Sequence, residues 1–366
     1  MGYLQIKGGQ LWCGDSFTSN EEIVYELPKE RDRTMELADD DFIIPGGLID
    51  MHAHLWAPPA VSSFGVAEEK LFTDGFVGAL DAGTYGVNDW ESADRYFQNG
   101  SMMQVKSFLS ILPEGLTIFP PVNPSSPDDV DEDKYVAVIN RNKDTALGVK
   151  VQLGWLNYKS VETDTQLLTS CRNIADRTGT NVMVHISGQC MSAQASANML
   201  KEKDILTHPY SGFANTILNE RGSVYQEILD AKKRGVIFDV GYAGKHFSWK
   251  VFRQAYDQGI IFDTLGMDIP TVIYRTPNSA VVDQFFVISG MLNANVDKNV
   301  IFRAMTTNPA KYLGFTLDRK QNCVVLKKYV ADAVAVDGQG DRISVKFEYK
   351  PMAVVNRGRL LQYKEN

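Results

Sequence analysis

The sequence predicts an α/β fold, a (β/α)8 TIM barrel joined to a small β-sandwich domain. Through the middle of the 366-residue chain, short apolar runs typical of buried parallel strands alternate with longer helical patterns. Eight such runs favour a closed barrel over a doubly wound open sheet, the alternative that shows the same alternation. At both ends of the chain, short strand patterns replace this alternation.

Each expected barrel strand is a short apolar run, and helical periodicity fills most of the gaps between the strands. The eight runs are 42–50, 77–81, 105–112, 147–153, 182–186, 205–207, 236–240 and 261–265. The expected helices lie at 67–75, 89–99, 131–141, 162–179, 192–203, 223–235 and 248–259, with a further helix at 302–315.

The strand patterns at the two ends of the chain are each too short to fold alone. Strands are expected at the N-terminal end over 3–12 and 21–27, and at the C-terminal end over 323–330, 331–338, 342–350 and 352–362. Pairing the two sets would bury the apolar faces of both. We therefore expect a small split β-domain of residues 1–44 and 322–366, and a barrel domain of residues 45–321.

Composition and charge argue against several classes of protein. Hydrophobic residues make up 44% and charged residues 22% of the chain, as in globular proteins, and a net charge of −8 gives no basic footprint for nucleic acid. No apolar run is long enough for a membrane span, and the N-terminus lacks a signal-peptide pattern. The four cysteines form no C-x-x-C pair, which is typical of reduced thiols. We expect a cytoplasmic protein that binds neither nucleic acid nor membranes.

The chain has only five histidines, and four of them lie at the ends of expected barrel strands. His52 and His54 end the first strand two residues apart, so their side chains point to the same face and can bind one metal ion. His185 and His208 end the fifth and sixth strands, and TIM barrels build their active sites at this rim. A lone histidine at a strand end is more often a core or loop residue. Four of them on three strand ends indicate a metal site.

Two further polar residues are expected on this rim. Lys150 is flanked by apolar residues in the fourth strand, where an unpaired ammonium group is costly to bury. Either Lys150 pairs with a carboxylate, or its amine has reacted with carbon dioxide to form a carbamate, an anionic ligand that can bridge two metals. Asp268, at the end of the eighth strand, can ligate a metal and accept a proton from water. Nitrogen and oxygen ligands without cysteine suit zinc, manganese or iron.

Motifs along nearly the whole chain resemble those of the amidohydrolase superfamily of metal-dependent hydrolases. In the barrel they are PGGLIDMHAH (45–54), GVKVQ (148–152), MVHIS (183–187), LTHPYSG (206–212), GMDIP (266–270) and TTNPAKYLG (306–314). The closing strands add ADAVAVD (331–337) and AVVNRGRLL (353–361). In that family a barrel is joined to a small β-sandwich built from both termini.

The resemblance implies a centre with two divalent metal ions, for which zinc is the first choice. His52, His54 and Asp268 would bind the more buried ion, and His185 and His208 would bind the second. Carbamylated Lys150 would bridge both ions, with a hydroxide between them that attacks a carbonyl carbon. Asp268 would take the proton and return it to the leaving nitrogen or oxygen.

Residues near the expected metal centre favour one subgroup of the superfamily. Dihydroorotases typically carry an arginine two residues after the second histidine, where this chain has Trp56. The amidohydrolase/deacetylase group, often described as dihydroorotase-like, is more similar, since it shares this aromatic residue and a motif like DAGTYG (81–86). That group has Gly-His-Gly in the seventh-strand loop. Here Tyr242 stands in place of the histidine, and His246 follows four residues later.

Five residues near strand ends are candidate substrate contacts, namely Trp56, Tyr85, Tyr242, His246 and Arg275. For His246 the alternative is an exposed loop residue, and for Arg275 it is a solvated loop charge. A guanidinium group would suit an anionic substrate, because its geometry matches that of a carboxylate.

We therefore expect a homo-oligomeric, metal-dependent hydrolase that cleaves an amide or ester bond, N-acyl or O-acyl, of a small carboxylate-bearing molecule. The alternative is a cyclic-amide hydrolase of the dihydroorotase or hydantoinase type, which would share the mechanism and differ in its pocket. A non-catalytic barrel kept for assembly would have lost metal ligands, and all six candidates are present.

Overall fold

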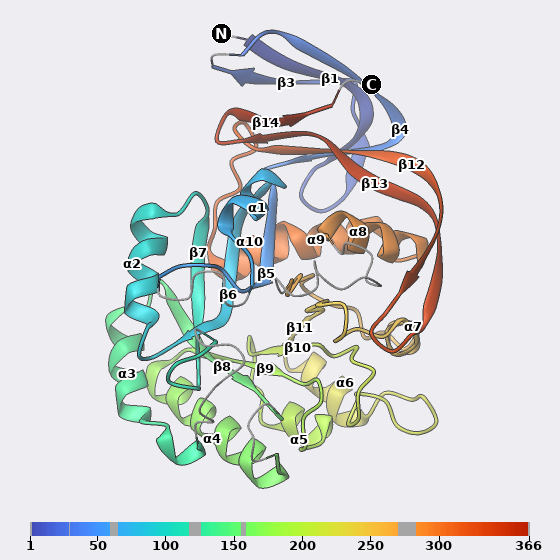
Figure 1. Ribbon diagram of the computed structural model, residues 1–366. Coiled ribbons are helices and arrows are strands. Elements are labelled where there is room, and N and C mark those ends of the chain that lie inside the picture. Colours follow the sequence, from blue (N-terminus) through green and yellow to red (C-terminus); the bar gives the residue numbers. More distant parts are fainter. Residues whose placement is uncertain are drawn as a thin grey trace.

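The computed structural model describes residues 2–28, 30–58, 65–116, 126–154, 159–269 and 283–364. Two seven-stranded sheets organise these residues. One sheet takes its strands from the middle of the chain, and the other takes its strands from both ends. In Figure 1 the sheet from the chain ends, drawn in blue and red, lies above the barrel.

The central sheet has parallel strands that follow one another in chain order, as a TIM barrel requires. They are β5 (Leu48–Ala53), β6 (Phe76–Gly86), β7 (Gln104–Ser110), β8 (Ala146–Gln152), β9 (Asn181–His185), β10 (Ile205–Thr207) and β11 (Ile237–Asp239). Between them lie α1 (Glu68–Thr73), α2 (Trp90–Gly100), a 3-10 turn (Pro127–Asp129), α3 (Glu132–Arg141), α4 (Val161–Thr178), α5 (Ala193–Asn198) and α6 (Gln226–Lys233), followed by α7 (Trp249–Asp257). Figure 1 shows α2, α3 and α4 on the outside of the sheet. The predicted α/β barrel is confirmed.

The eighth position of the barrel holds an extended segment in place of a regular strand. Thr264 forms an isolated parallel bridge with Asp239 of β11. On the other side, the Leu265 amide donates to the carbonyl of Ala304, which belongs to a helix, at 3.1 Å. Since this edge bonds here to a helix, no continuous ladder forms over 261–265, and the prediction of a regular strand there is wrong.

The prediction of one strand over 42–50 is also wrong, because the chain turns there from one sheet to the other. β4 (Arg33–Pro45) ends before Gly46 and Gly47, and β5 begins after them. Both glycines have positive φ, 97° and 75°, a conformation that other residues rarely adopt. At Gly47 a Cβ atom would also lie 2.8 Å from the carbonyl oxygen of Gly75. The Pro-Gly-Gly turn therefore separates the two sheets.

The second sheet is built from both ends of the chain, in the order β14-β13-β12-β4-β1-β2, with β3 also paired to β1. A separate apolar core cluster lies among its strands. The predicted strands at 323–330 and 331–338 are one long strand, because a register irregularity between Val330 and Ala333 does not end it. The strands other than β4 are β1 (Gly2–Trp12), β2 (Phe17–Ser19), β3 (Glu22–Leu27), β12 (Cys323–Val336), β13 (Arg342–Asn356) and β14 (Arg359–Tyr363).

Three helices late in the chain lie between the barrel and the second sheet in Figure 1: α8 (Gln284–Asn293), α9 (Lys298–Met305) and α10 (Thr307–Leu313). Periodicity does not reveal α8, because seven of its ten residues are buried and no polar face remains. The single helix predicted at 302–315 is two helices, which meet at Thr306, where φ is −133° and ψ is −84°.

The β12–β13 hairpin extends from the second sheet along the side of the barrel (Figure 1). Its turn, residues 337–341, contacts the start of α7. The Trp249 amide donates to Asp337 Oδ2 at 2.6 Å, and Ser248 Oγ donates to Asp341 Oδ2 at 3.1 Å. The sheet formed by the chain ends is therefore fastened to the barrel at the loop before α7.

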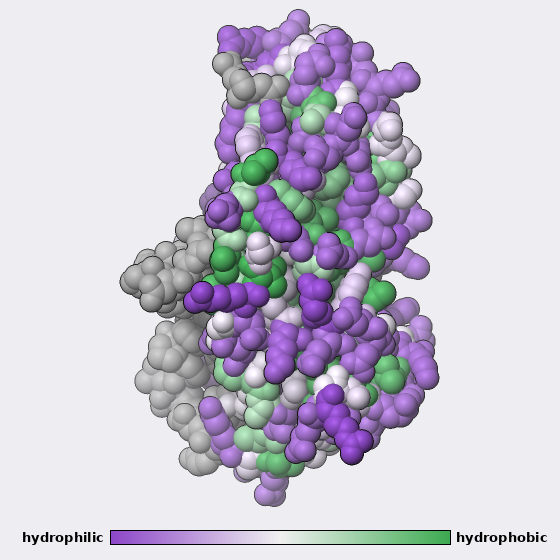
Figure 2. All heavy atoms as spheres, turned by 90° about the vertical axis from the view of Figure 1, so that its right-hand side faces the viewer, coloured by the Kyte–Doolittle hydropathy of each residue, from purple (hydrophilic) through white to green (hydrophobic). Residues whose placement is uncertain are grey.

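The surface on this side of the molecule is largely hydrophilic, with hydrophobic residues in small groups (Figure 2). Of the nine exposed large hydrophobic residues in the described part of the chain, four lie on β12, and Val330 is 97% exposed. No helix among the described residues is both long enough and apolar enough to cross a membrane.

We predict that Trp12 is a main connection between the two parts. Its Nε1 donates to Thr306 Oγ1 at 3.0 Å, and the side chain is 1% exposed. Trp12→Ala should lower the free energy of unfolding by about 3–5 kcal/mol, the range for a buried large aromatic side chain. Val24→Ala, at an exposed position of β3, should change it by no more than about 0.5 kcal/mol. Denaturant unfolding followed by circular dichroism measures both, and equal effects would contradict this role.

Candidate metal centre

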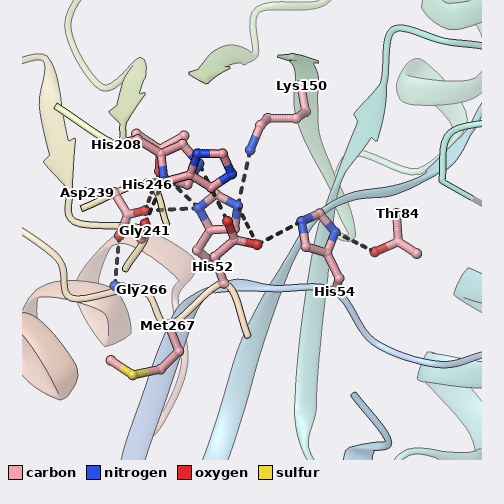
Figure 3. Close-up of polar contacts among 12 residues, drawn as sticks. His52, His54, Thr84, Lys150, His208, Asp239, Gly241, His246, Gly266 and Met267 are labelled. Atoms are coloured by element: carbon pink, nitrogen blue, oxygen red, sulfur yellow. Dashed lines mark hydrogen bonds and ion pairs between the residues drawn. The ribbon is translucent and has the colours of Figure 1, made fainter. Parts of the chain in front are cut away.

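Two imidazoles, from His52 in β5 and from His54 just after it, meet one carboxylate from the eighth segment at the rim of the barrel. His52 and His54 are each 1% exposed and lie next to each other in Figure 3. Asp268 Oδ1 lies 3.7 Å from His52 Nε2 and 3.3 Å from His54 Nε2. Asp268 Oδ2 lies 3.6 Å from His208 Nε2. One carboxylate therefore has imidazole nitrogens near both of its oxygens.

His208 carries a buried nitrogen that no protein group satisfies. Its Nδ1 donates to the carbonyl oxygen of Gly241 at 2.6 Å, which leaves the lone pair on Nε2. This Nε2 is buried and has no hydrogen-bond partner among the described residues. Ligand atoms of His52, His208 and Asp268 all lie within 4.8 Å of one another. A buried lone pair facing a carboxylate fits a metal ion held between these groups.

Burial also sets the charge of these groups. It lowers the pKa of both His52 and His208 well below the ordinary value, so the imidazoles are neutral and can ligate a metal. Lys150 is 1% exposed, with Nζ 3.3 Å from His52 Nε2, and burial lowers the pKa of this amine to about 8. Among the described residues no ion pair joins Lys150 to a carboxylate. The carboxylate partner considered for Lys150 is therefore not found.

His185 lies beside the cluster, but its ring is engaged elsewhere. Its ring centroid is 4.2 Å from that of His208. Its Nε2 lies 3.2 Å from the carbonyl oxygen of Ser187, which can only accept, so Nε2 carries a proton in this rotamer. Metal ligation by His185 therefore remains a prediction.

Buried carboxylates support His52 and His54 through the Nδ1 atoms of the two rings. Asp239 Oδ2 lies 3.2 Å from His52 Nδ1. His54 Nδ1 lies 2.9 Å from Thr84 Oγ1, which donates to Asp81 Oδ2 at 2.7 Å. Each histidine therefore donates from Nδ1 and presents the Nε2 lone pair to the centre, as Figure 3 shows for His54. Asp81 and Asp239 are not among the residues predicted for the site, although each is an acidic residue within an apolar strand.

Two residues of the cluster have backbone conformations that are uncommon for non-glycine residues. φ is 62° at His208 and 45° at Asp268. Such conformations cost about 1–3 kcal/mol each and persist where the surrounding structure enforces them, often at functional sites. The Asp268 amide donates to the His52 carbonyl at 2.7 Å, which holds this carboxylate opposite β5.

The remaining candidate substrate contacts lie in different surroundings. Trp56 is half-buried in the loop after β5. Tyr85 and Tyr242 are 0% and 1% exposed, and the Tyr85 hydroxyl fastens that loop through the Leu55 carbonyl oxygen at 2.8 Å. Arg275 lies outside the described residues. Contact with substrate remains a prediction for all of them.

His246 is brought into the site by the loop after β11. It is 6% exposed, with its ring centroid 4.8 Å from that of His185 and 4.7 Å from that of His208. Its Nδ1 lies 2.6 Å from Ser187 Oγ, which in turn lies 2.9 Å from Ser211 Oγ. The alternative of an exposed loop residue is therefore wrong, because this loop packs the imidazole against the two histidines.

The chain is similar to known proteins both in sequence and in structure. No protein-family model matches the chain. The chain is similar to a deacetylase of Brucella anthropi, 24% identical over 315 residues that cover 83% of this chain and 77% of the relative. A deacetylase of Agrobacterium fabrum is 24% identical over 322 residues, 86% of this chain and 77% of the relative. Among solved structures, a dihydroorotase covers 98% of both chains with a TM-score of 0.78 and 20% identity.

The resemblance to the amidohydrolase superfamily is confirmed. The sequence relatives carry the deacetylase name, and the solved dihydroorotase shares the fold. The amidohydrolase resemblance therefore now rests on the motifs, on the fold and on the buried His52, His208 and Asp268 cluster.

In this amidohydrolase-like centre, Asp239→Asn should weaken the binding of a divalent metal ion by about 10–100-fold, because the amide is a weaker acceptor for His52 Nδ1–H. Competition with a coloured chelator on metal-free protein measures the affinity. Asp94→Asn removes a half-buried carboxylate on α2 and should leave the affinity unchanged. Wild-type affinity in Asp239→Asn would contradict the supporting role.

Proposed function

We propose that the protein is a metal-dependent hydrolase that removes an acyl group from the nitrogen or oxygen of a small, carboxylate-bearing molecule. The observation that carries this proposal is the buried Asp268 carboxylate with His52 and His54 near one oxygen and His208 near the other. The deacetylase name of both sequence relatives supports an acyl group as the part removed.

We propose that the site holds two divalent ions, both zinc, with the His185 ring turned from the Ser187 carbonyl to ligate one of them. His52 and His54 would hold one ion and His185 and His208 the other, with Asp268 completing the first set. A set of nitrogen and oxygen donors without cysteine, open to one side, is typical of a catalytic zinc centre. When bound, such ions polarise the substrate carbonyl and make water a better nucleophile near neutral pH.

Asp268 is the proton carrier in this proposal. Its carboxylate lies at the centre of the site and is 5% exposed, so it meets the attacking water in a poorly solvated place. As the water attacks the acyl carbon, Asp268 accepts its proton. The same carboxyl then returns the proton to the nitrogen or oxygen that leaves. Protonation of the leaving group lets the carbon–nitrogen or carbon–oxygen bond break without forming a free anion.

We also propose that Lys150 is carbamylated. A buried amine whose pKa is lowered to about 8 has an accessible neutral form, and among the described residues no carboxylate forms an ion pair with it. The neutral Nζ would attack the carbon of carbon dioxide, form an N–C bond and lose one proton. The product is an anionic oxygen ligand, which suits a position beside His52 at the centre of a metal site.

Lys150→Ala should therefore lose most of the bound metal and most of the hydrolytic activity. Metal analysis of purified wild-type protein should give about two divalent ions per chain, the number that a centre with a bridging carbamate requires. Protein treated with ¹³C-bicarbonate should show a carbamate carbon signal that is absent from Lys150→Ala. Lys106→Ala, at a half-buried lysine of β7, is the matched control. Full metal content and turnover in Lys150→Ala would contradict the bridging role.

The substrate class can be tested with a panel of small molecules. Trp56 stands where dihydroorotases carry the arginine that holds the substrate carboxylate, so we expect N-acetyl and O-acetyl derivatives of small carboxylates to be hydrolysed faster than dihydroorotate or hydantoin. Values of kcat/KM on the zinc-loaded protein measure the preference. Faster opening of dihydroorotate or hydantoin would favour the cyclic-amide alternative.

For partners, we propose a small-molecule substrate and a homo-oligomer of this chain in the cytoplasm. The exposed apolar residues of β12, including Val330 and Val334, supply a surface that a second copy could cover. This surface lies on the hairpin that also contacts the loop before α7.

A further inference from the structure

The turn of the β12–β13 hairpin contacts two loops near His246. One is the loop that contains Ser211 and Gly212, and the other is the loop that carries His246 itself. His246 is fixed through Ser187, which also bonds to Ser211. Gly212, the residue after Ser211, lies so close to the hairpin turn that a Cβ atom there would overlap the side chain of Gln339. The turn also contacts the loop that carries His246, because a Cβ atom at Gly338 would lie 2.7 Å from the carbonyl oxygen of Lys245, the residue before His246.

Two carboxylates of the turn fix the loop end that follows His246. Asp337 Oδ2 accepts from the Trp249 amide at 2.6 Å, while its Oδ1 accepts from the amides of Gln339 and Asp341 at 2.8 and 3.0 Å. Asp337 thus shapes the turn and fastens the first residue of α7 at the same time. Asp341 accepts from the Ser248 hydroxyl at 3.1 Å.

The loop that carries His246 depends on outside contacts to keep its path. Three of its residues have positive φ, 50° at Gly241, 42° at Ala243 and 67° at Gly244. The first half of this loop is bonded to the eighth segment, because the Tyr242 and Ala243 amides donate to the carbonyls of Gly266 and Met267 at 3.0 and 2.9 Å. The next residues, at Lys245, pack against the hairpin turn, and such a backbone keeps one conformation where neighbours enforce it. Asp337 is 7% exposed, so its bond to the Trp249 amide is shielded from water.

We propose that the hairpin turn, residues 337–341, is a positioning element that sets the place of His246 in the substrate pocket. The turn contacts the loop on both sides of His246, at Lys245 before it and at Ser248 and Trp249 after it. The imidazole itself is bonded to Ser187, which is bonded to Ser211. Asp337 and Asp341 act through the loop and do not touch the reacting atoms. The effect on catalysis rests on the proposed function and on the predicted contact of His246 with substrate, whereas the effect on the position of His246 does not.

A pair of glycine substitutions in the same turn tests this proposal. Gly338→Ala places a methyl group against the backbone of Lys245, so the turn and the loop must move apart. Gly340→Ala is the matched control, because it strains the turn at φ 89° but its Cβ atom would meet nothing within 4 Å. The reactivity of His246 toward diethylpyrocarbonate, followed by mass spectrometry of its peptide, reports the position of the imidazole. His52 and His54, whose rings are not among those packed against His246, serve as internal references.

We expect His246 in Gly338→Ala to react about tenfold faster than in wild type and in Gly340→Ala, with unchanged metal content. On the zinc-loaded enzyme, Gly338→Ala should raise KM for the best acyl substrate by about tenfold and change kcat less, because the shift acts on substrate binding. An unchanged His246 reactivity overturns the proposal, whether or not the protein hydrolyses any substrate. If His246 reactivity rises and no acyl compound is hydrolysed by wild type, the proposed function fails and the positioning role stands.

Asp341→Ala is a second variant in case Gly338→Ala does not fold. It removes the partner of the Ser248 hydroxyl and keeps the backbone of the turn. Faster modification of His246 in this variant supports the proposal, and wild-type reactivity overturns it. Asp332→Ala, at an exposed aspartate on the same hairpin, should leave His246 unchanged.

Discussion

The joining of β5 to the segment that ends in Asp268 is the constraint on which the site depends. In place of a regular ladder, the buried Asp50 carboxylate accepts from the amides of His52 and Met267 at 2.9 and 3.0 Å. The Asp268 amide returns a bond to the His52 carbonyl. Gly266 permits this close approach, since a Cβ atom there would overlap the Cβ atom of His52. The irregular closure therefore places the Asp268 carboxylate against the histidines.

Desolvation explains why this arrangement suits a cation. The imidazoles of His52 and His208 are buried in their neutral form, and the His208 Nε2 lone pair faces the Asp268 carboxylate without a donor between them. Two acceptors facing each other in a dry place are unfavourable unless a positive group joins them. A divalent ion would supply that charge, and its binding free energy would add to the stability of the folded state.

The sequence allowed the rim of the barrel to be predicted but not the contacts that support it. His52, His54, Lys150, His208 and Asp268 could be placed together because parallel strands of a barrel end at one rim. The bond of His52 to Asp239 joins residues 187 positions apart, which no local pattern specifies.

The predictions that the structure contradicts failed for similar physical reasons. Burial of His246 depends on the path of a loop with three positive φ values, and a single sequence leaves that path open. The eighth strand is irregular because its bonds go to a helix and to side chains, while its apolar composition is that of an ordinary strand. The all-round apolar α8 has no period to detect.

The sheet formed by the chain ends takes part in the site through one strand. β12 pairs with β4 near Phe42 and continues to the turn that begins at Asp337. Its 14 residues span about 45 Å at the rise of an extended strand. Because β4 is also paired to β1, the position of this turn depends on strands from both ends of the chain. If the turn positions His246 as proposed, a change that loosens β1 or β4 would shift the loop of His246 without altering the barrel.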